Sequence, residues 1–283
     1  MTPTVSHRVA IQGIKSSFHE QAAQQLFAGH ALEIIPCFSF RQVAQTLKAD
    51  AADYAVLAIE NSIAGSILGN YRLIQDYHFK IVGELYVHIQ MNLMALPGTP
   101  LEAIQSVYSH PIALQQCAEY LHTLPDVQLI DWQDTASAAH MIHERQRHDA
   151  AAVAGKAAAE EYGLEIIAPR IETNKQNFTR FLLLSKSLSD TPDFDKASIS
   201  FRLGSGVGEL AEVLTAIARH GINLTKVQSV PVIGKPSEYT FYLDLVWEEN
   251  TGDYAGALEA VLRRVSSLSL LGEYKKAQMR YEG

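Results

Sequence analysis

The sequence predicts an α/β fold made of two lobes with a cleft between them, followed by a smaller domain whose elements run in the order βαββαβ. Three observations predict this fold class. Strand-like and helical segments alternate twice in the first part of the chain, a stretch rich in Ser, Thr, Asp and Pro follows, and a different order of elements occupies the last part. With 283 residues, 47% of them hydrophobic, the chain is long enough for about two globular domains.

The first lobe is predicted from short apolar runs that alternate with segments of helical period. Ser39 precedes the second helical segment and is placed to cap it, because its hydroxyl can accept a free backbone N–H. Such alternation predicts a parallel sheet that is covered on both faces. The expected strands are residues 8–12, 32–38 and 54–59, and the expected helices are residues 18–28, a segment from residue 40 and a segment after residue 66.

The second lobe repeats this pattern after an extended stretch at 81–96, which is expected to cross between the lobes. The apolar run at 178–184 is expected to return. The lobes therefore cover about residues 1–83 with 176–188, and about residues 84–175. The expected strands of the second lobe are residues 106–108, 127–130 and 150–154, with helices from Pro111 and from Thr135.

Residues 189–196 have the composition of a linker, and residues 197–283 form the last domain. The order βαββαβ is the ferredoxin-like pattern. The expected strands of this domain are residues 198–203, 224–230, 238–246 and 274–281, with helices at residues 209–220 and 254–265.

Composition argues against several classes of protein. A formal net charge of −8 argues against non-specific binding of nucleic acid, which needs a basic surface. Cys37 and Cys117 are the only cysteines, so no disulfide framework is expected and a reducing compartment fits. No signal-peptide core and no run of about 18 apolar residues is found, so a cytoplasmic protein without a membrane partner is expected.

The pair Thr179-Arg180 is the first candidate for chemistry, at the start of an apolar run. Arg180 offers a planar fork of donors suited to a carboxylate, and Thr179 offers a hydroxyl that can hydrogen-bond a leaving or attacking oxygen. Taken alone, such a pair more often marks a strand that begins with an exposed Thr and a surface ion pair.

Three loops that follow buried strands place polar groups at the edge where the carboxyl ends of parallel strands meet. Asn61 lies in a Glu-Asn-Ser segment, Ser109 is expected to cap the helix that follows it, and Asp134 opens a third helix. Free N–H groups at helix starts bind anions. Ser109 and Asp134 taken singly could be caps alone, and Gln116 could face either the cleft or solvent.

The eleven histidines include one loose group, His140, His143 and His148. No cysteine or carboxylate completes a ligand set with them in the sequence, so a structural or exposed role is expected and no metal is predicted.

These motifs, taken in order, resemble the prephenate dehydratase family over nearly the whole chain. One motif departs from the family, which usually has Gly-Pro-x-Gly-Thr-Phe-Ser where this chain has Gly13-Ile14-Lys15-Ser16-Ser17-Phe18-His19. Ser17 keeps a hydroxyl where Thr is usual. The matching segments are Ile59 to Ser62 with Gly65-Ser66, Ser109 to Pro111 with Gln116-Cys117, Asp134 to Ala139, Ala151 to Leu164, and Asn177 to Phe181.

The resemblance implies a catalytic domain similar to periplasmic binding proteins, which converts prephenate to phenylpyruvate, water and CO2 in phenylalanine biosynthesis without a cofactor. Thr179 is then expected to donate to the leaving hydroxyl, and Arg180 to bind the pyruvyl carboxylate. The remaining expected site residues orient the ring and the second carboxylate: Asn61, Ser62, Ser109 and Gln116 in the catalytic group, and Glu60, Thr135, Ser17 and Phe181 as substrate contacts.

The last domain resembles the ACT regulatory domain of the same family, which binds phenylalanine at a subunit interface. The resemblance implies a homodimer or homotetramer with L-phenylalanine as effector. This chain departs at Glu209, where Ala is usual, and at Gln228-Ser229-Val230-Pro231, where the family has Glu-Ser-Arg-Pro. A dimerisation domain without a ligand is therefore the alternative. The expected effector residues are Gly208, Glu209, Leu210, Asn223 and Leu224.

Other interpretations stay open. Arogenate, which has an amino group in place of a keto group, is the alternative substrate. A small-acid binding protein without chemistry and an interaction protein that only assembles oligomers are the alternatives from other classes. Polar residues at separate helix starts favour catalysis over both. No segment before Arg8 is long enough for a helical chorismate mutase domain, so a fused bifunctional enzyme is not expected.

Overall fold

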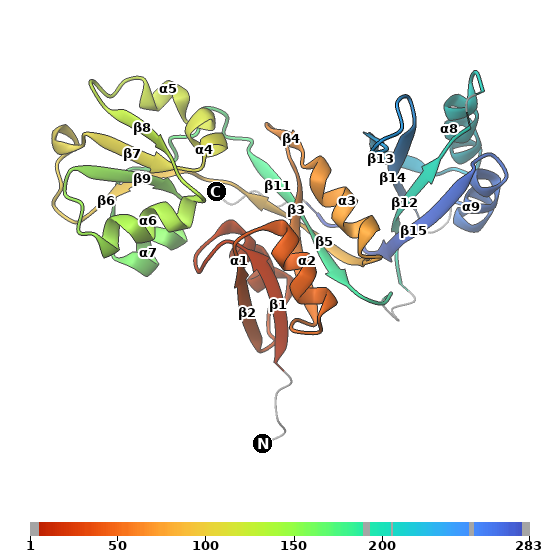
Figure 1. The fold of residues 1–283 in the computed structure, drawn as a ribbon, viewed down its shortest axis with the longest axis horizontal. Helices are drawn as coiled ribbons and strands as arrows, with labels where there is room; N and C mark the ends of the chain where they lie inside the picture. Colours follow the sequence, from red (N-terminus) through yellow and green to blue (C-terminus); the bar gives the residue numbers. More distant parts are fainter. Residues whose placement is uncertain (1–5, 189–192, 205, 249–251, 279–283) are drawn as a thin grey trace. The chain divides into compact units, whose positions relative to one another are not determined.

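The computed structural model describes residues 6–188, 193–204, 206–248 and 252–278 (Figure 1). The chain divides into two compact units. The first unit comprises residues 1–70, 85–181 and 278–283, and the second comprises residues 71–84 and 182–277. The division falls within strands β5 (Lys80–His88) and β11 (Phe178–Ser185). The lobe and domain boundaries expected from the sequence stay a prediction, and residues 189–192 of the expected linker lie outside the described residues.

The first sheet has the strand order β2-β1-β3-β11-β5, with a two-residue β4 paired to β3. The central β1 is parallel to both of its neighbours, as strand–helix alternation predicts. The remaining elements of this region are β1 (His7–Gln12), α1 (Phe18–Leu26), β2 (Leu32–Cys37), α2 (Phe40–Lys48), β3 (Tyr54–Asn61), β4 (Gly65–Ser66) and α3 (Leu68–Asp76).

The helices and strands expected in this region are confirmed, with ends that differ by one or two residues. Ser39 caps α2 as expected, because its hydroxyl accepts the N–H of Gln42 at 3.2 Å. Only β4 was not predicted. It pairs Ser66 with Glu60 across a tight return, and two residues are too few to show an alternating pattern.

The second sheet has the order β10-β6-β9-β7-β8. β7 is parallel to β8 and β9, whereas β6 is antiparallel to β9 and β10, so this sheet is mixed. Its elements are β6 (Asn92–Ala95), a 3-10 turn (Leu101–Ala103), β7 (Ser106–Ser109), α4 (Pro111–Gln116), α5 (Ala118–Leu121), β8 (Gln128–Asp131), α6 (Thr135–Glu144), β9 (Ala150–Ala154), α7 (Lys156–Tyr162) and β10 (Glu165–Ala168).

The extended stretch expected at 81–96 is two strands, because β5 and β6 belong to different sheets. Between them the backbone bonds to a second crossing segment. The N–H of Ile89 donates to the carbonyl of Asn177 at 2.7 Å, and the N–H of Ile171 donates to the carbonyl of Met91 at 2.7 Å. Strand β10 was not predicted, and it is a short edge strand of four residues.

Alanine allows close packing of helix on strand in the second sheet. All five residues of β9, Ala-Ala-Ala-Val-Ala, are fully buried. Helix α6 packs on β9 (Figure 1) through Ala136, Ala138 and Ala139, which are also fully buried. Small side chains on both elements bring the backbones close together, and this holds the start of α6 at the edge of the sheet.

The third sheet lies in the second unit and has the order β13-β14-β12-β15, with every pair antiparallel. This topology confirms the ferredoxin-like prediction. Its elements are β12 (Lys196–Arg202), α8 (Glu209–Arg219), β13 (Asn223–Pro231), β14 (Tyr239–Val246), α9 (Tyr254–Leu262) and β15 (Ser267–Tyr274).

The expected position of the last strand is wrong. Residues 274–281 were expected to form it, but β15 is Ser267–Tyr274, and residues 275–278 are not in a strand. Residues 279–281 of the expected strand lie outside the described residues. Its register against β12 pairs Ser267 with Arg202 and Tyr274 with Lys196. Leu268 and Leu270 then join the apolar cluster under the helices, so the alternation of Ser and Leu at the start of this segment determines the strand.

The face of the third sheet opposite α8 and α9 carries a buried ion pair. The Lys196 ammonium donates to both carboxylate oxygens of Glu84 at 2.9 Å, and the two side chains are 3% and 1% exposed. Asp244 lies 4.0 Å from the same ammonium and accepts the hydroxyl of Ser198 at 2.5 Å. Buried charges of this kind are stable only when every partner is present.

Cys37 and Cys117 are both buried and free, which agrees with the absence of a disulfide framework in the sequence. Within the described ranges, none of the helices is both long and apolar enough to cross a membrane.

We expect Glu84→Gln to lower the free energy of unfolding by about 3 kcal/mol, because it leaves the Lys196 charge buried with only the more distant Asp244. Urea unfolding measures this loss. Glu238→Gln is the matched control, since Glu238 pairs with Lys235 at 3.2 Å on the surface and should contribute no more than about 0.5 kcal/mol. Equal losses in the two variants would contradict the buried-pair interpretation.

Candidate active site

The first unit contains a cavity of about 620 Å³. Its lining comes from the loops after β1, β2, β3 and β7, from the starts of α4 and α6, and from β11. The cleft predicted between two lobes is thus present within this unit. Residues from loops of the first sheet and from loops of the second sheet meet there.

Four helices begin at the cavity. The caps accept backbone N–H groups of the first turn: Ser17 from Glu20 at 3.3 Å, Ser39 from Gln42 at 3.2 Å, His110 from Ile112 at 3.2 Å and Asp134 from Ser137 at 2.8 Å. Each cap lines the cavity. Helix starts carry partial positive charge, so the four together form a surface suited to an anion. Among the described residues of the lining there is no Lys or Arg.

Asn61 lies at the end of β3, and the direction of its amide is determined by the backbone. Its Oδ1 accepts the N–H of Ile63 at 3.0 Å and of Ala64 at 2.8 Å. The carbonyl end of the amide therefore faces its own loop, and the NH2 end faces β11. This NH2 donates to the Oγ1 of Thr179 at 3.0 Å and to the Oδ1 of Asn177 at 2.7 Å.

The Thr179 hydroxyl accepts from Asn61, so its own proton is directed elsewhere. Thr179 lines the cavity and is only half-buried. Gln116 completes the network, since it donates to Asn61 at 3.1 Å and accepts from Asn177 at 2.9 Å. The network thus fixes the amide that contacts Thr179 at the cavity.

Three further expected residues line the cavity as predicted. Ser17 and Thr135 lie at the starts of α1 and α6, and Phe181 follows Thr179 by two residues, on the same face of β11. Phe181 packs edge-to-face on His19, with ring centroids 4.9 Å apart.

Ser109 does not cap α4 as expected, and its place in the catalytic group stays a prediction. It is the fully buried last residue of β7, and its hydroxyl donates to the carbonyl of Val153 at 2.6 Å. The cap of α4 is His110, one residue later, whose imidazole was not predicted as a site residue. A Ser at the end of a strand can satisfy either element, and here the neighbouring strand β9 takes its hydroxyl.

Arg180 is also placed differently from the prediction. It is 4% exposed and is not part of the cavity lining, because successive residues of a strand point to opposite faces and Thr179 and Phe181 occupy the cavity face. The expectation that its guanidinium binds the pyruvyl carboxylate stays a prediction.

Glu60 and Ser62 flank the cavity without lining it. Glu60 pairs with Ser66 in the β3–β4 return. The hydroxyl of Ser62 donates to the carbonyl of Gln176 at 3.0 Å and accepts the N–H of Phe178 at 2.9 Å. Ser62 thus joins the loop after β3 to the start of β11 and holds Asn61 and Thr179 at a common edge.

Sequence reasoning missed several residues of the site, namely His19, Ser39 as a lining residue, His110 and the side chain of Asn177. The helix caps had a usable signal, because Ser39 stands before a helical segment just as Ser17 and Asp134 do. Asn177 begins the family segment Asn177 to Phe181, but nothing in the sequence identifies its partners Asn61 and Gln116, which lie far away.

Both imidazoles at the cavity are held in the neutral form. Nε2 of His19 accepts the N–H of Ala58 at 3.4 Å, and burial lowers the pKa of His19 to about 3. Burial also lowers the pKa of His110, although Asp134 and Asp131 act in the opposite direction. Each ring uses one nitrogen to accept a backbone N–H and keeps its proton on the other.

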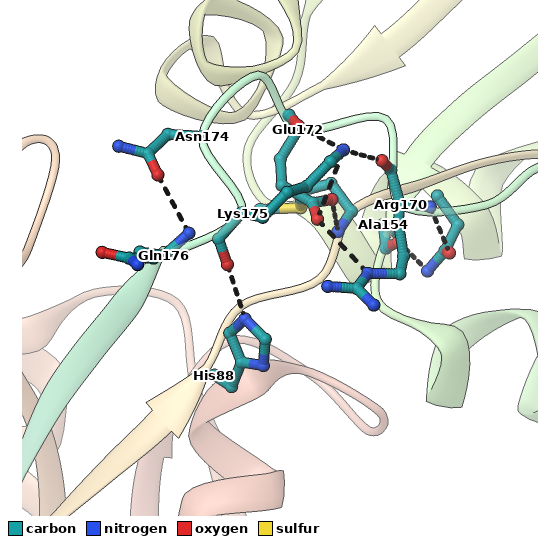
Figure 2. A network of polar contacts seen from close by, with 9 residues as sticks. His88, Ala154, Arg170, Glu172, Asn174, Lys175 and Gln176 are labelled. Atoms are coloured by element: carbon teal, nitrogen blue, oxygen red, sulfur yellow. Dashed lines mark hydrogen bonds and ion pairs between the residues drawn. The ribbon is translucent and has the colours of Figure 1, made fainter. Parts of the chain in front are cut away.

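A buried carboxylate organises the segment that leads to β11 (Figure 2). Glu172 is fully buried and accepts the N–H of Met91 at 2.8 Å, with Arg170 and Lys175 at 3.8 and 3.7 Å. The ammonium of Lys175 also donates to the carbonyls of Glu172 and Arg170. His88, at the end of β5, hydrogen-bonds to the carbonyl of Lys175 at 2.8 Å. The segment before β11 is therefore bonded to His88 and to Met91, on the stretch that leads from β5 to β6.

No group of three or more His, Cys, Asp or Glu residues in the described parts of the chain is arranged to hold a metal ion.

The comparisons with known proteins identify the family of this chain. A family model described as prephenate dehydratase matches residues 9–189. A bifunctional chorismate mutase/prephenate dehydratase of Aquifex aeolicus (strain VF5) is 35% identical over 95% of this chain and 74% of its own length. Arogenate dehydratase 5, chloroplastic, of Arabidopsis thaliana is 38% identical over 97% of this chain and 69% of its own length. The chain belongs to the prephenate dehydratase family.

Two solved structures share the fold over nearly the full chain. A prephenate dehydratase from Arthrobacter aurescens in complex with L-Phe has a TM-score of 0.84 at 28% identity, covering 95% of this chain and 90% of its own. GqqA, described as a novel type of quorum quenching acylases, has a TM-score of 0.84 at 29% identity, covering 94% of this chain and 97% of its own. Proteins described with different activities thus share this fold, so the site has to decide the chemistry. The likeness to periplasmic binding proteins stays a prediction.

Because burial holds the pKa of His19 at about 3, well below the ordinary value of about 6.5, the unfolded chain binds the extra proton first on acidification. The stability contributed by the neutral imidazole is present above about pH 6.5 and is lost as the pH falls from there toward about 3. We expect His19→Gln to remove about 2 kcal/mol of the loss in unfolding free energy between about pH 7 and about pH 5.

Urea unfolding at the two pH values measures this difference. His30→Gln is the control, because His30 is exposed and its replacement should leave the wild-type pH dependence in place. An unchanged pH dependence in His19→Gln would show that His19 is not buried in the neutral form.

Proposed function

We propose that this chain is a prephenate dehydratase, which removes hydroxide and CO2 from prephenate to leave phenylpyruvate. One observation carries the proposal. The Thr179 hydroxyl accepts from Asn61, so this contact does not use its proton, and Thr179 lines a cavity that four helix starts make suitable for an anion.

The bond changes need one proton donor. The C–O bond to the leaving hydroxyl breaks, and the C–C bond to the departing carboxylate breaks with its electron pair entering the ring, which becomes aromatic. The hydroxide takes a proton and leaves as water. Thr179 donates or relays this proton, and because a threonine hydroxyl is a very weak acid, the transfer accompanies bond cleavage.

Helix starts, with neutral imidazoles beside them, hold the two carboxylates of the substrate. The N–H groups at the starts of α1, α2 and α6 supply fixed partial charges, and the unshared ring N–H groups of His19 and His110 add donors. Such dispersed donors bind a dianion without the bidentate ion pair that a guanidinium would form with the departing carboxylate. Over-stabilising that carboxylate in the ground state would not raise turnover.

An acylase, the activity in the description of one structural relative, is not favoured by this cavity. Hydrolysis of an amide through a hydroxyl nucleophile needs a base that accepts its proton. Both imidazole acceptor nitrogens, on His19 and His110, are already bonded to backbone N–H groups, and the partner of Thr179 is the amide of Asn61.

The lining also favours a keto acid over its amino counterpart, arogenate. An ammonium group in the cavity needs an anionic or carbonyl partner. Asp134 is the only carboxylate among the described lining residues, and its Oδ1 is used to cap α6. We therefore propose prephenate as the preferred substrate, which parallel assays with prephenate and arogenate test directly.

We expect Thr179→Val to lower kcat for phenylpyruvate formation by roughly 10²–10⁴, because the leaving hydroxide loses its proton donor. An ultraviolet assay of phenylpyruvate measures it. Thr225→Val, at an exposed position of β13, is the matched control and should keep wild-type kcat.

Asn61→Asp supplies a second test of the same role. The new carboxylate would accept the Thr179 proton that the wild-type amide leaves free, so kcat should fall although the hydroxyl is still present. Near-normal kcat in Thr179→Val would refute the role of Thr179 as the proton donor.

The C-terminal domain is proposed to bind L-phenylalanine through Gly208, Glu209, Leu210, Asn223 and Leu224. The side chain of Glu209 bears on this proposal. Its Oε1 accepts the N–H of Gly206 at 3.0 Å, just before the start of α8. This carboxylate occupies a donor that the carboxylate of an amino acid would otherwise use, so the effector has to displace it.

We therefore expect Glu209→Ala to tighten the binding of L-phenylalanine by about tenfold, since one charge-assisted hydrogen bond no longer competes. Calorimetric titration measures it. Glu212→Ala, exposed in the same first turn of α8, is the control and should bind as the wild type does. Silence of both the wild type and Glu209→Ala at millimolar ligand would favour a dimerisation domain without an effector.

A homodimer or homotetramer assembled through this domain and a cytoplasmic location complete the proposal. The edge strand β13 supports assembly. Among the described strands it pairs with β14 alone, and alternate residues along it, from Asn223 to Pro231, are exposed.

A further inference from the structure

A second cavity, of about 440 Å³, lies within the second unit. Its lining comes from α3 and the residues just after it, from the end of β12 and from the β13–β14 hairpin. Ile199, Phe201 and Leu243 of the same strands belong to the core under α8 and α9. Because strand residues alternate, Arg202 and Tyr242 face the opposite side, where the cavity lies.

Arg202 brings a positive charge to the cavity with no carboxylate against it. The guanidinium is half-buried, and its Nε donates to the hydroxyl of Thr240 at 3.3 Å. Within the described residues no ion pair of Arg202 is found at 4.0 Å or less. Its two terminal nitrogens, with four N–H donors, are therefore available to a bound anion.

Arg72 adds a second guanidinium, on α3. It pairs with Asp76 at 3.2 Å, and both side chains are about half exposed. Asp76 is the one carboxylate of the described lining, so two guanidinium groups face a single negative charge. A surface pair of this kind contributes little and reorganises at low cost when another anion arrives.

The phenol of Tyr242 forms the buried part of the cavity and donates to the Oε1 of Gln75 at 2.7 Å. Burial and then Asp76 raise its pKa, to about 12, while Arg202 and Arg72 act in the lowering direction. The electrostatic field of both guanidinium groups therefore reaches the same buried phenol, which places the two charges around one hollow.

The remaining wall is aliphatic. Val230, Pro231 and Val232 line it, and Ile233, which also lines it at the tip of the hairpin, is 70% exposed. A cavity with guanidinium groups on one side and branched aliphatic side chains on the other fits a ligand with a charged head and a short apolar body.

We propose that this cavity binds a small branched aliphatic carboxylate, with its carboxylate on Arg202 and Arg72 and its aliphatic part on the wall from Val230 to Ile233. The cavity shares no residue with the one that contains Thr179, and it includes none of the residues proposed for L-phenylalanine. It is therefore a separate binding site in the second unit. A free metabolite and the C-terminus of a peptide can both present a carboxylate next to a branched aliphatic group, so both fit this description.

The experiment is a calorimetric titration of the full chain with 4-methylpentanoate, repeated with 4-methylpentanamide as the neutral analogue. We expect the acid to bind with a Kd on the order of 1 mM and the amide to show no binding. Arg202→Gln should weaken the acid at least about tenfold, because one charge-assisted contact is lost. Arg219→Gln, at the end of α8 and outside the cavity, should bind as the wild type does. A peptide ending in Leu, titrated in parallel, distinguishes the two sources.

A second pair of variants avoids any effect on folding. Ile233 is largely exposed, so neither Ile233→Asp nor Ile233→Asn should disturb the hairpin. Only the aspartate adds a negative charge at the cavity mouth, so it should weaken the acid more than the asparagine does. No heat from the wild type at tens of millimolar, equal binding of acid and amide, or an unchanged Kd in both Arg202→Gln and Ile233→Asp would each overturn the proposal.

Discussion

The site depends on the direction in which one amide points. Asn61 uses its carbonyl oxygen to accept two backbone N–H groups of its own loop, so its NH2 end can only face β11. That end donates to the Thr179 hydroxyl, so this contact does not use the hydroxyl proton, which we propose is donated to the substrate. Gln116 and Asn177 bond to both ends of the same amide and hold it in place. A weakly acidic hydroxyl is useful as a donor only when its geometry is arranged in this way.

The second constraint is electrostatic. The proposed substrate carries two negative charges, yet the described lining of its cavity has no Lys or Arg. Helix starts take the place of cations, and their dipoles are held rigidly by the sheets behind them. The neutral imidazole of His19 also adds no positive charge to this lining, because its burial keeps the pKa at about 3. Three arginines of the described residues lie elsewhere: Arg180 is not part of the cavity lining, and Arg72 and Arg202 line a separate cavity in the second unit.

The sequence-based predictions were accurate where the interacting residues are close together in the sequence, and they failed where the partners are far apart. Ser39 and Asp134 were predicted as caps because the cap and the N–H that it accepts are three residues apart. Ser109 failed because a neighbouring strand, distant in the sequence, takes its hydroxyl and leaves His110 to cap the helix. Thr179 and Arg180 are adjacent in a strand, so only one of them can face the cavity, and nothing local says which.

By itself, the sequence determined the order and type of nearly all the elements, the ferredoxin-like pattern and the motifs that identify the family, because periodicity and capping act between near neighbours. The tertiary structure alone decided which face of β11 meets the cavity, which amide directs the Thr179 hydroxyl, and where the last strand begins. These outcomes depend on pairs such as Asn61 with Asn177, which are 116 residues apart in the sequence and meet because β3 and β11 are neighbours in the first sheet. Contacts of that range leave no periodic or local signal in a single sequence.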